Sequence, residues 1–135
     1  MKALSTILTG AGLALAACGP CLAGEEELAP GYNACMEKAY GNDVETRECM
    51  RKAHAYWDRK LNENYRAAKE SCSSKACAKK LLEAERAWLK WRDLMAELLY
   101  ESHGGGSMYI ARSICFEAEA TKLQAQKLAR LTGEE

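Results

Sequence analysis

Charge of one sign, long apolar stretches and proline are what this chain of 135 residues has little of. Lys and Arg together number 19, as do Asp and Glu, so no basic excess indicates a nucleic-acid partner and no acidic excess indicates a solvating tail. One apolar run comes near membrane length, at the N-terminus, which excludes a protein with several membrane spans. The length suits one domain and excludes a large multi-domain enzyme.

Residues that interrupt helices are scarce as well. The two prolines are Pro20 and Pro30, and the only glycines between Asn42 and Leu131 are the three at 104–106. That stretch has just five β-branched residues and is rich in Ala, Leu, Glu, Lys and Arg, which lose little conformational freedom in a helix. The composition therefore predicts an all-α domain with one glycine loop.

Residues 1–23 have the pattern of an export signal peptide. Lys2 supplies a positive N-region, residues 3–17 form a small, mostly apolar run, and Ala23 is the small residue that favours cleavage. Residues 15–18 also fit a bacterial lipobox, in which Cys18 would carry lipid and tether the domain to a membrane. Plain export and lipidation stay open as alternatives. Both predict a periplasmic or secreted protein, and only lipidation at Cys18 would give it a membrane contact, through the lipid anchor.

Apolar spacing divides the remaining chain into a lead-in (24–34), a helical domain (35–131) and a tail (132–135). Asn42, followed by Glu45, is typical of a capping box, and Ser107 is a typical N-cap after the glycines. Apolar residues recur every three or four positions along 49–72, 77–98 and 110–128. With a shorter helix around 32–40, the pattern predicts an antiparallel bundle of three long helices plus a short N-terminal helix, stapled by disulfides.

Seven cysteines in so short a chain indicate disulfides formed in an oxidising compartment. Cys72 and Cys77 face each other across the turn at 73–76, so we expect them to pair. Cys35 and Cys49 would then join the short helix to the first long helix.

Cys115 is left over in this scheme. It lies roughly 12 Å along its helix, whereas Cys72 ends a helix roughly 40 Å long, so the two cannot approach to bonding distance. If the chain is cleaved after Ala23, Cys115 is an odd thiol. If Cys18 is lipidated, Cys21 survives and could complete a third pair.

Three motifs follow one another at specific spacings. The first is Asp58-x-x-Leu61-Asn62-x-x-Tyr65, the second runs from Leu82 to Asp93 and includes Trp88 and Arg92, and the third is Gly105-Gly106-Ser107 followed by Cys115 and Thr121. In this order they resemble the LprI-like lysozyme-inhibitor N-terminal domain family, which pairs an LNxxY motif with an AQxxWxxxRD motif and a GGS loop. The resemblance covers most of residues 35–128 and implies an exported, non-catalytic binding module that inhibits lysozyme-type muramidases.

The chain departs from the family pattern at three positions. Glu85 replaces the usual Gln of the second motif, and Gln124 stands where Arg is common. Ala96 occupies the place of a cysteine that usually pairs with the equivalent of Cys115. The resemblance therefore implies the fold more firmly than it implies any binding residue.

Most motif residues are expected to have a structural role. Trp88 lies on the apolar stripe and should belong to the core. Arg92 could fork onto Asp58 or onto a backbone carbonyl and so fix the register of the helices. The expected structural set is Asp58, Leu61, Asn62, Tyr65, Trp88, Trp91, Arg92 and Asp93.

The loop from His103 to Ser107 is the candidate recognition element, with a flexible connector as the alternative. Three consecutive glycines (Gly104, Gly105 and Gly106) are useful where backbone must approach another surface closely. A muramidase cleft carries two carboxylates, to which His103 or Ser107 could hydrogen-bond. An acidic rim would steer a basic hydrolase toward the loop: Glu97, Glu101, Glu117 and Glu119.

Other classes of function have less support. One alternative is a helical envelope scaffold or stress protein without a hydrolase partner, which would bind through the basic end at Lys75, Lys79 and Lys80. No nucleophile–base arrangement or phosphate loop fits the helices, so we do not expect an enzyme. His54 and His103 fall in no metal-ligand spacing, so we expect no metal ion and no cofactor.

Overall fold

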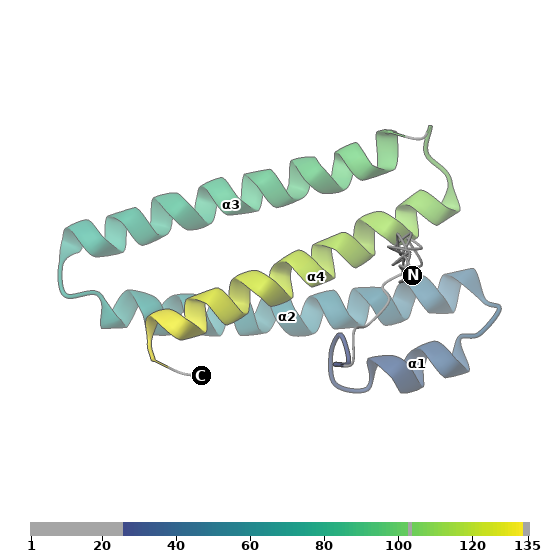
Figure 1. Ribbon diagram of the computed structural model, residues 1–135, viewed down its shortest axis with the longest axis horizontal. Helices are drawn as coiled ribbons and strands as arrows, with labels where there is room; N and C mark the ends of the chain where they lie inside the picture. Colours follow the sequence, from purple (N-terminus) through teal and green to yellow (C-terminus); the bar gives the residue numbers. More distant parts are fainter. Residues whose placement is uncertain (1–25, 103, 134–135) are drawn as a thin grey trace, which may run out of the picture.

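A computed structural model describes residues 26–102 and 104–133. These residues form four helices and no strand: α1 (Tyr32–Lys38), α2 (Asp43–Ser71), α3 (Lys75–Glu101) and α4 (Ser107–Leu131) (Figure 1). The predicted all-α fold, with three long helices and a short N-terminal one, is confirmed. The segment predicted as a signal peptide, with Cys18 and Cys21, and His103 lie outside the described residues.

The helix starts follow from local sequence. The Asn42 side chain accepts hydrogen bonds from the backbone N–H groups of Val44 (3.0 Å) and Glu45 (3.1 Å), as the predicted cap of α2 requires. Ser74 caps α3 by accepting from Cys77 N–H at 3.1 Å. Ser73 and Ser74 lie between the apolar patterns of α2 and α3. Ser74 is therefore also the residue at which the next helix starts.

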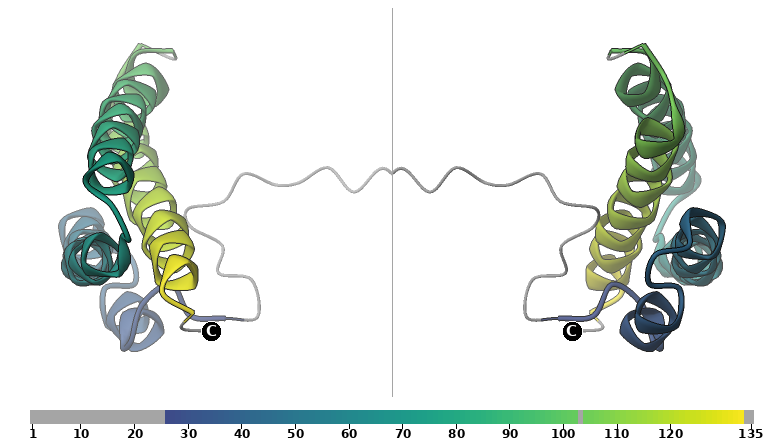
Figure 2. Two further views of the ribbon diagram at one scale, coloured as in Figure 1. Left: turned by 90° about the vertical axis from the view of Figure 1, so that its left-hand side faces the viewer. Right: turned by 90° about the vertical axis from the view of Figure 1, so that its right-hand side faces the viewer.

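The three long helices form an open arrangement in which α4 lies in the middle. It packs along α2 and also against α3, whereas α2 and α3 barely contact each other and diverge beyond their connection (Figure 1). Viewed along the helices, α1 and α2 lie together on one side of α3 and α4 (Figure 2). Helix α3 therefore has a single helical neighbour over most of its length.

Small side chains bring α2 and α4 close together. Ala53 and Ala68 of α2 and Ala118 and Ala125 of α4 are all buried. Met50 fills the core near the α1 end, and Leu61 packs with Ala125 and Leu128 toward the other end. This interface is the main apolar core of the domain.

Part of the segment expected as a lead-in belongs to the core. Leu28 and Ala29 are buried, and Trp57 Nε1 donates to the Leu28 carbonyl at 2.6 Å. Lys122 Nζ donates to the Glu27 carbonyl at 3.3 Å and lies 5.6 Å from the centre of the Trp57 ring. The packed fold thus begins before the first helix.

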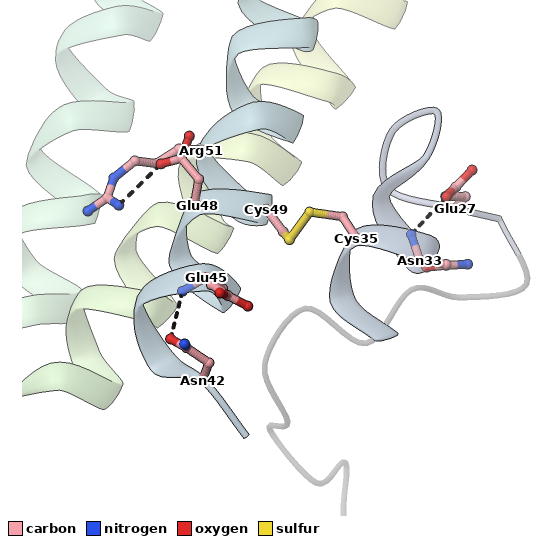
Figure 3. Close-up of a disulfide and its surroundings, with 8 residues drawn as sticks. All are labelled: Glu27, Asn33, Cys35, Asn42, Glu45, Glu48, Cys49 and Arg51. Atoms are coloured by element: carbon pink, nitrogen blue, oxygen red, sulfur yellow. Dashed lines mark hydrogen bonds and ion pairs between the residues drawn. A yellow bond between two sulfur atoms is a disulfide. The ribbon is translucent and has the colours of Figure 1, made fainter. Parts of the chain in front are cut away.

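Both predicted disulfides are confirmed. Cys35 of α1 pairs with Cys49 of α2 across a Cα–Cα distance of 5.8 Å, beside the Asn42 cap (Figure 3). Cys72 pairs with Cys77 across the α2–α3 turn at 5.6 Å. Cys115 also takes part in a disulfide, so it is not an odd thiol here. Disulfides of this kind persist in oxidising compartments, in agreement with the expected export.

No helix among residues 26–102 and 104–133 combines the length and the apolar character that crossing a membrane requires.

Candidate functional site

The glycine loop is a closed turn with defined backbone conformation. Gly104 N–H donates to the Glu101 carbonyl at 3.0 Å, and Gly105 N–H donates to the Tyr100 carbonyl at 3.1 Å, which together end α3. Gly104, Gly105 and Gly106 have φ values of 78°, 75° and 114°, in the region that favours glycine. The backbone path of the turn therefore places all three glycines in a conformation that other residues rarely adopt.

Gly105 also lies against the end of α3. A Cβ at this position would lie 3.0 Å from the hydroxyl oxygen of Tyr100. The loop backbone therefore rests on the Tyr100 side chain, which helps to fix the shape of the tip.

The prediction that Ser107 caps α4 is wrong. Gly106 is the N-cap, its carbonyl accepts from Tyr109 and Ile110 N–H at 3.1 Å each, and no side chain caps the helix. The chain reverses within the glycines, so Ser107 already has helical geometry and is exposed as the first residue of α4.

A pocket beside the loop separates the N-terminal turns of α2 and α4. Its volume is about 260 Å³, and its lining includes Asp43, Arg47 and Met50 of α2 and Ser107 and Met108 of α4. The serine expected to contact a partner thus lines a pocket that also presents the Arg47 guanidinium and an apolar wall.

The expected acidic rim is divided over different faces. Glu97 and Glu117 line one open groove between α3 and α4, of about 530 Å³, together with Asp93. Glu101 is the exposed last residue of α3. Glu119 lies near Tyr32 of α1 instead, and burial raises the pKa of its carboxyl group. Burial also raises the pKa of Tyr32, and the charge of Glu119 adds to that effect.

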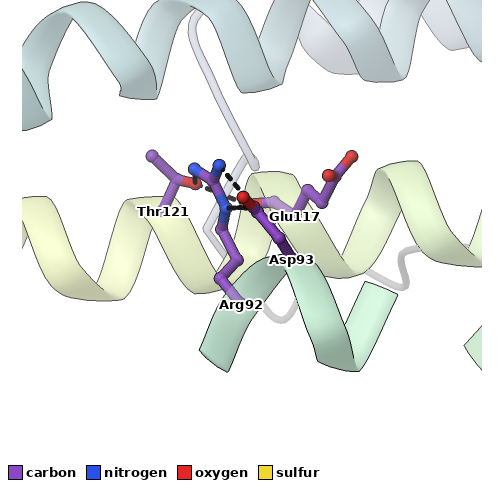
Figure 4. Close-up of polar contacts among 4 residues, drawn as sticks. All are labelled: Arg92, Asp93, Glu117 and Thr121. Carbon is purple, nitrogen blue, oxygen red and sulfur yellow. Dashed lines mark hydrogen bonds and ion pairs between the residues drawn. The ribbon is translucent and has the colours of Figure 1, made fainter. Parts of the chain in front are cut away.

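Arg92 connects α3 to α4 from a buried position. Its Nε and Nη2 donate to Oδ1 of Asp93 at 2.9 and 2.8 Å, and its Nη1 donates to the Thr121 hydroxyl at 3.3 Å (Figure 4). Thr121 in turn donates to the Glu117 carbonyl at 2.6 Å. The guanidinium lies 5.3 Å from the centre of the Trp88 ring. Arg92 thus joins α3 to α4 through its hydrogen bond to Thr121, rather than through Asp58 or a backbone carbonyl.

Asp58 is not one of those partners. No hydrogen bond or ion pair joins Arg92 to Asp58 in the described part of the chain. Asn62 Nδ2 instead donates to the Asp58 carbonyl at 2.8 Å, within α2. The first motif therefore stabilises its own helix, while Leu61, with Tyr65 beside it, packs against α4.

The sequence presents His54 only as a candidate metal ligand and predicts no other role for it. It is half-buried on α2, and its Nε2 has no hydrogen-bond partner among the described residues. Burial lowers its pKa, as does the Arg92 charge, while the carboxylates of Glu117, Asp58 and Asp93 act in the opposite direction. The signal was its position one turn before Asp58, which places it beside the polar residues between the long helices.

Glu85 is buried at 8% exposure, on the α3 face that meets α4. Gln124 Nε2 donates to its Oε2 at 3.0 Å, and its Oε1 has no partner in the residues that are described. Burial raises the pKa of Glu85, against the opposing effects of Gln124 and Arg92. The ionised carboxylate therefore destabilises the folded state.

Glu85→Gln is expected to raise the free energy of unfolding at neutral pH by about 1 kcal/mol, because a neutral amide replaces a buried charge. Since the pKa of Glu85 is higher in the folded state, its penalty is absent below the unfolded pKa and grows as pH rises through the folded pKa. Urea unfolding at pH 4 and pH 7 measures this difference. An equal gain at both values, or no gain at pH 7, would contradict the assignment.

No group of three or more His, Cys, Asp or Glu side chains within the described ranges could hold a metal ion.

The comparisons with known proteins give one family. The sequence model of the lysozyme inhibitor LprI family matches residues 35–131, which is most of the chain. No curated protein and no solved structure shows significant similarity. The family is one of inhibitors and is non-catalytic. Together with the helical fold and the motifs, this match shows that the chain belongs to the LprI lysozyme inhibitor family.

Proposed function

We propose that this protein binds a lysozyme-type hydrolase outside the cytoplasm and blocks its substrate cleft. Family membership over residues 35–131 is the observation that carries the proposal. The disulfides support the compartment, since they persist where such hydrolases act.

The end of the molecule that carries the glycine loop is the proposed contact surface. At its narrow tip, Gly104 to Ser107, the glycines expose backbone without side chains, so the tip can enter a cleft. The Ser107 hydroxyl and the Arg47 guanidinium would supply hydrogen bonds to the two carboxylates of the hydrolase. Exposed Met108, beside them, would add apolar contact. We include His103 in the proposed contact surface, as a further residue that could hydrogen-bond to the carboxylates of the hydrolase.

The direct test is a lysozyme turbidity assay with the purified protein. Inhibition that saturates at one inhibitor per hydrolase is the expected result. Absence of inhibition at about 50 µM, where even a weak specific complex would form, would remove the proposal.

The role of the loop is tested by Gly104→Ala and Gly106→Ala. A Cβ at either position meets open space, but the positive φ values disfavour alanine, so the backbone of the tip must change. We expect inhibition to weaken at least about tenfold, equivalent to about 1.4 kcal/mol.

Gly133→Ala is the matched control for these variants. Gly133 has a φ of 80° and open space around it, but it follows the far end of α4. Strain alone would therefore affect all three variants alike. Undiminished inhibition by the loop variants, or an equal loss of inhibition in Gly133→Ala, would show that the hydrolase does not contact the glycine loop.

A further inference from the structure

Helix α3 carries an apolar face that none of the other described helices covers. Trp91, Leu94 and Leu98 are 49%, 54% and 54% exposed. They recur at intervals of three and four residues and therefore form one stripe. Both Trp91 and Leu98 belong to the apolar pattern along 77–98, but they remain exposed because, among the described helices, α3 packs against α4 alone.

Helix α4 extends this surface. Phe116 contacts Trp91 edge-on with ring centres 5.8 Å apart, and the exposed Leu123 lies two turns further along the same face of α4. Phe116 and Leu123 each lie two residues before an alanine packed toward α2, so they point to the opposite side. The patch, which we call the outer face, consists of residues on the side of α3 and α4 away from α2: Trp91, Leu94, Leu98, Phe116 and Leu123.

We propose that the outer face is the interface of a homodimer in which two copies of α3 pack antiparallel. The charge distribution along α3 favours this occupant. Its first part carries five exposed cations and one exposed acid, Glu83, which pairs with Lys79 at 3.9 Å; exposed Asp93, Glu97 and Glu101 follow. The five cations are Lys75, Lys79, Lys80, Arg86 and Lys90. An antiparallel copy aligns the basic part of one helix with the acidic part of the other, whereas a parallel copy would align like charges.

Side-chain size along the outer face fits the same arrangement. The stripe on α3 has large side chains in its C-terminal half, namely Trp91, Leu94 and Leu98. Exposed Ala84 and Ala87 continue it into the N-terminal half of the helix. A two-fold axis beside Trp91 sets Leu98 of one copy against Ala84 of the other, so that a large side chain meets a small one. The same axis places Arg86 opposite Glu97 of the second copy, on the flank of the stripe.

The expected affinity is modest. Helix α3 has 27 residues and is therefore about 40 Å long. A strip of that length with the α4 side chains beside it gives an interface on the order of 1,000 Å² in total, at the lower bound of specific interfaces. A dissociation constant in the micromolar range, on the order of 10 µM, is the expected result.

Sedimentation equilibrium of the purified protein from about 1 to about 300 µM tests the proposal. We expect a monomer–dimer equilibrium that Trp91→Glu and Leu94→Glu weaken more than about tenfold. Leu82→Glu is the matched control, because Leu82 is exposed on the other flank of the same helix, and it should leave the equilibrium unchanged. Circular dichroism verifies that each variant is folded.

The orientation is tested by charge reversal. Arg86→Glu and Glu97→Arg should each weaken the dimer, because each sets like charges face to face, and the double variant should restore it. A monomer at every concentration, a dimer insensitive to Trp91→Glu, or a double variant no better than the single ones would overturn the proposal. These variants lie outside the glycine loop, so hydrolase inhibition by a monomeric Trp91→Glu protein separates this inference from the proposed function.

Discussion

Removing the Cys35–Cys49 disulfide, by Cys35→Ser with Cys49→Ser, is expected to lower the free energy of unfolding by about 3 kcal/mol. The bond closes a loop of sequence separation 14, and it joins α1 to α2 at the main core. In the chain-entropy description, opening a loop of about 15 residues gives the unfolded state this much additional freedom. Urea unfolding followed by circular dichroism measures the change.

The other disulfide provides the comparison. Cys72 and Cys77 are separated by 5 positions, and the smaller loop predicts a loss of about 2 kcal/mol in the corresponding double serine variant. The surrounding turn is also exposed, so fewer packing contacts depend on it. A larger loss from opening the small loop than from opening the large one would contradict this ranking.

Arg92→Ala is expected to cost about 2 kcal/mol, because it removes a largely buried side chain and its contacts on both helices, whereas Asp93, at 56% exposure, can be solvated by water. The substitution leaves Asp93 without its ion pair at 2.8 Å and opens a cavity beside Trp88. Arg92→Lys should recover little of the loss, since one ammonium group cannot reproduce the fork that reaches both Asp93 and Thr121.

Arg51→Ala is the control for Arg92→Ala. The Arg51 side chain is 52% exposed and pairs with Glu48 at 3.8 Å across one turn of α2. A surface pair of this kind contributes at most about 0.5 kcal/mol. Both variants remove a cation, but only Arg92→Ala also removes a buried contact between helices. The difference between their free energies of unfolding, measured by the same urea titration, therefore reports the buried contact. Comparable losses in the two variants would rule out the assigned role of Arg92.

The helices and disulfides were predictable from local information. Asn42 marks a helix start through its own side chain, and the separation of Cys72 from Cys77 fits one turn between two helices. The Asn42 cap and the Cys72–Cys77 disulfide thus each depend on residues that lie close together in sequence. The family resemblance, which depends on motif order, is likewise confirmed.

Properties that depend on helix rotation and neighbours were harder to predict. Glu117 and Glu119 are two positions apart, so they point to different faces of α4 even though both lie in one acidic segment. Trp91 is apolar and correctly spaced for a core, but its exposure depends on how many helices reach α3. Arg92 and its partner Thr121 are 29 positions apart in sequence, so their contact depends on the relative register of two helices, which no local pattern determines.

The single-neighbour packing of α3 also has a consequence for local opening. Detaching this helix would disrupt its contacts with α4 while leaving the alanine-lined contact of α2 with α4 in place. Its backbone amides should therefore exchange with solvent deuterium through a partial, low-energy fluctuation, whereas those of α2 and α4 should require unfolding of the whole domain. Because α3 anchors one arm of the glycine turn, that turn would lose its shape in each such fluctuation.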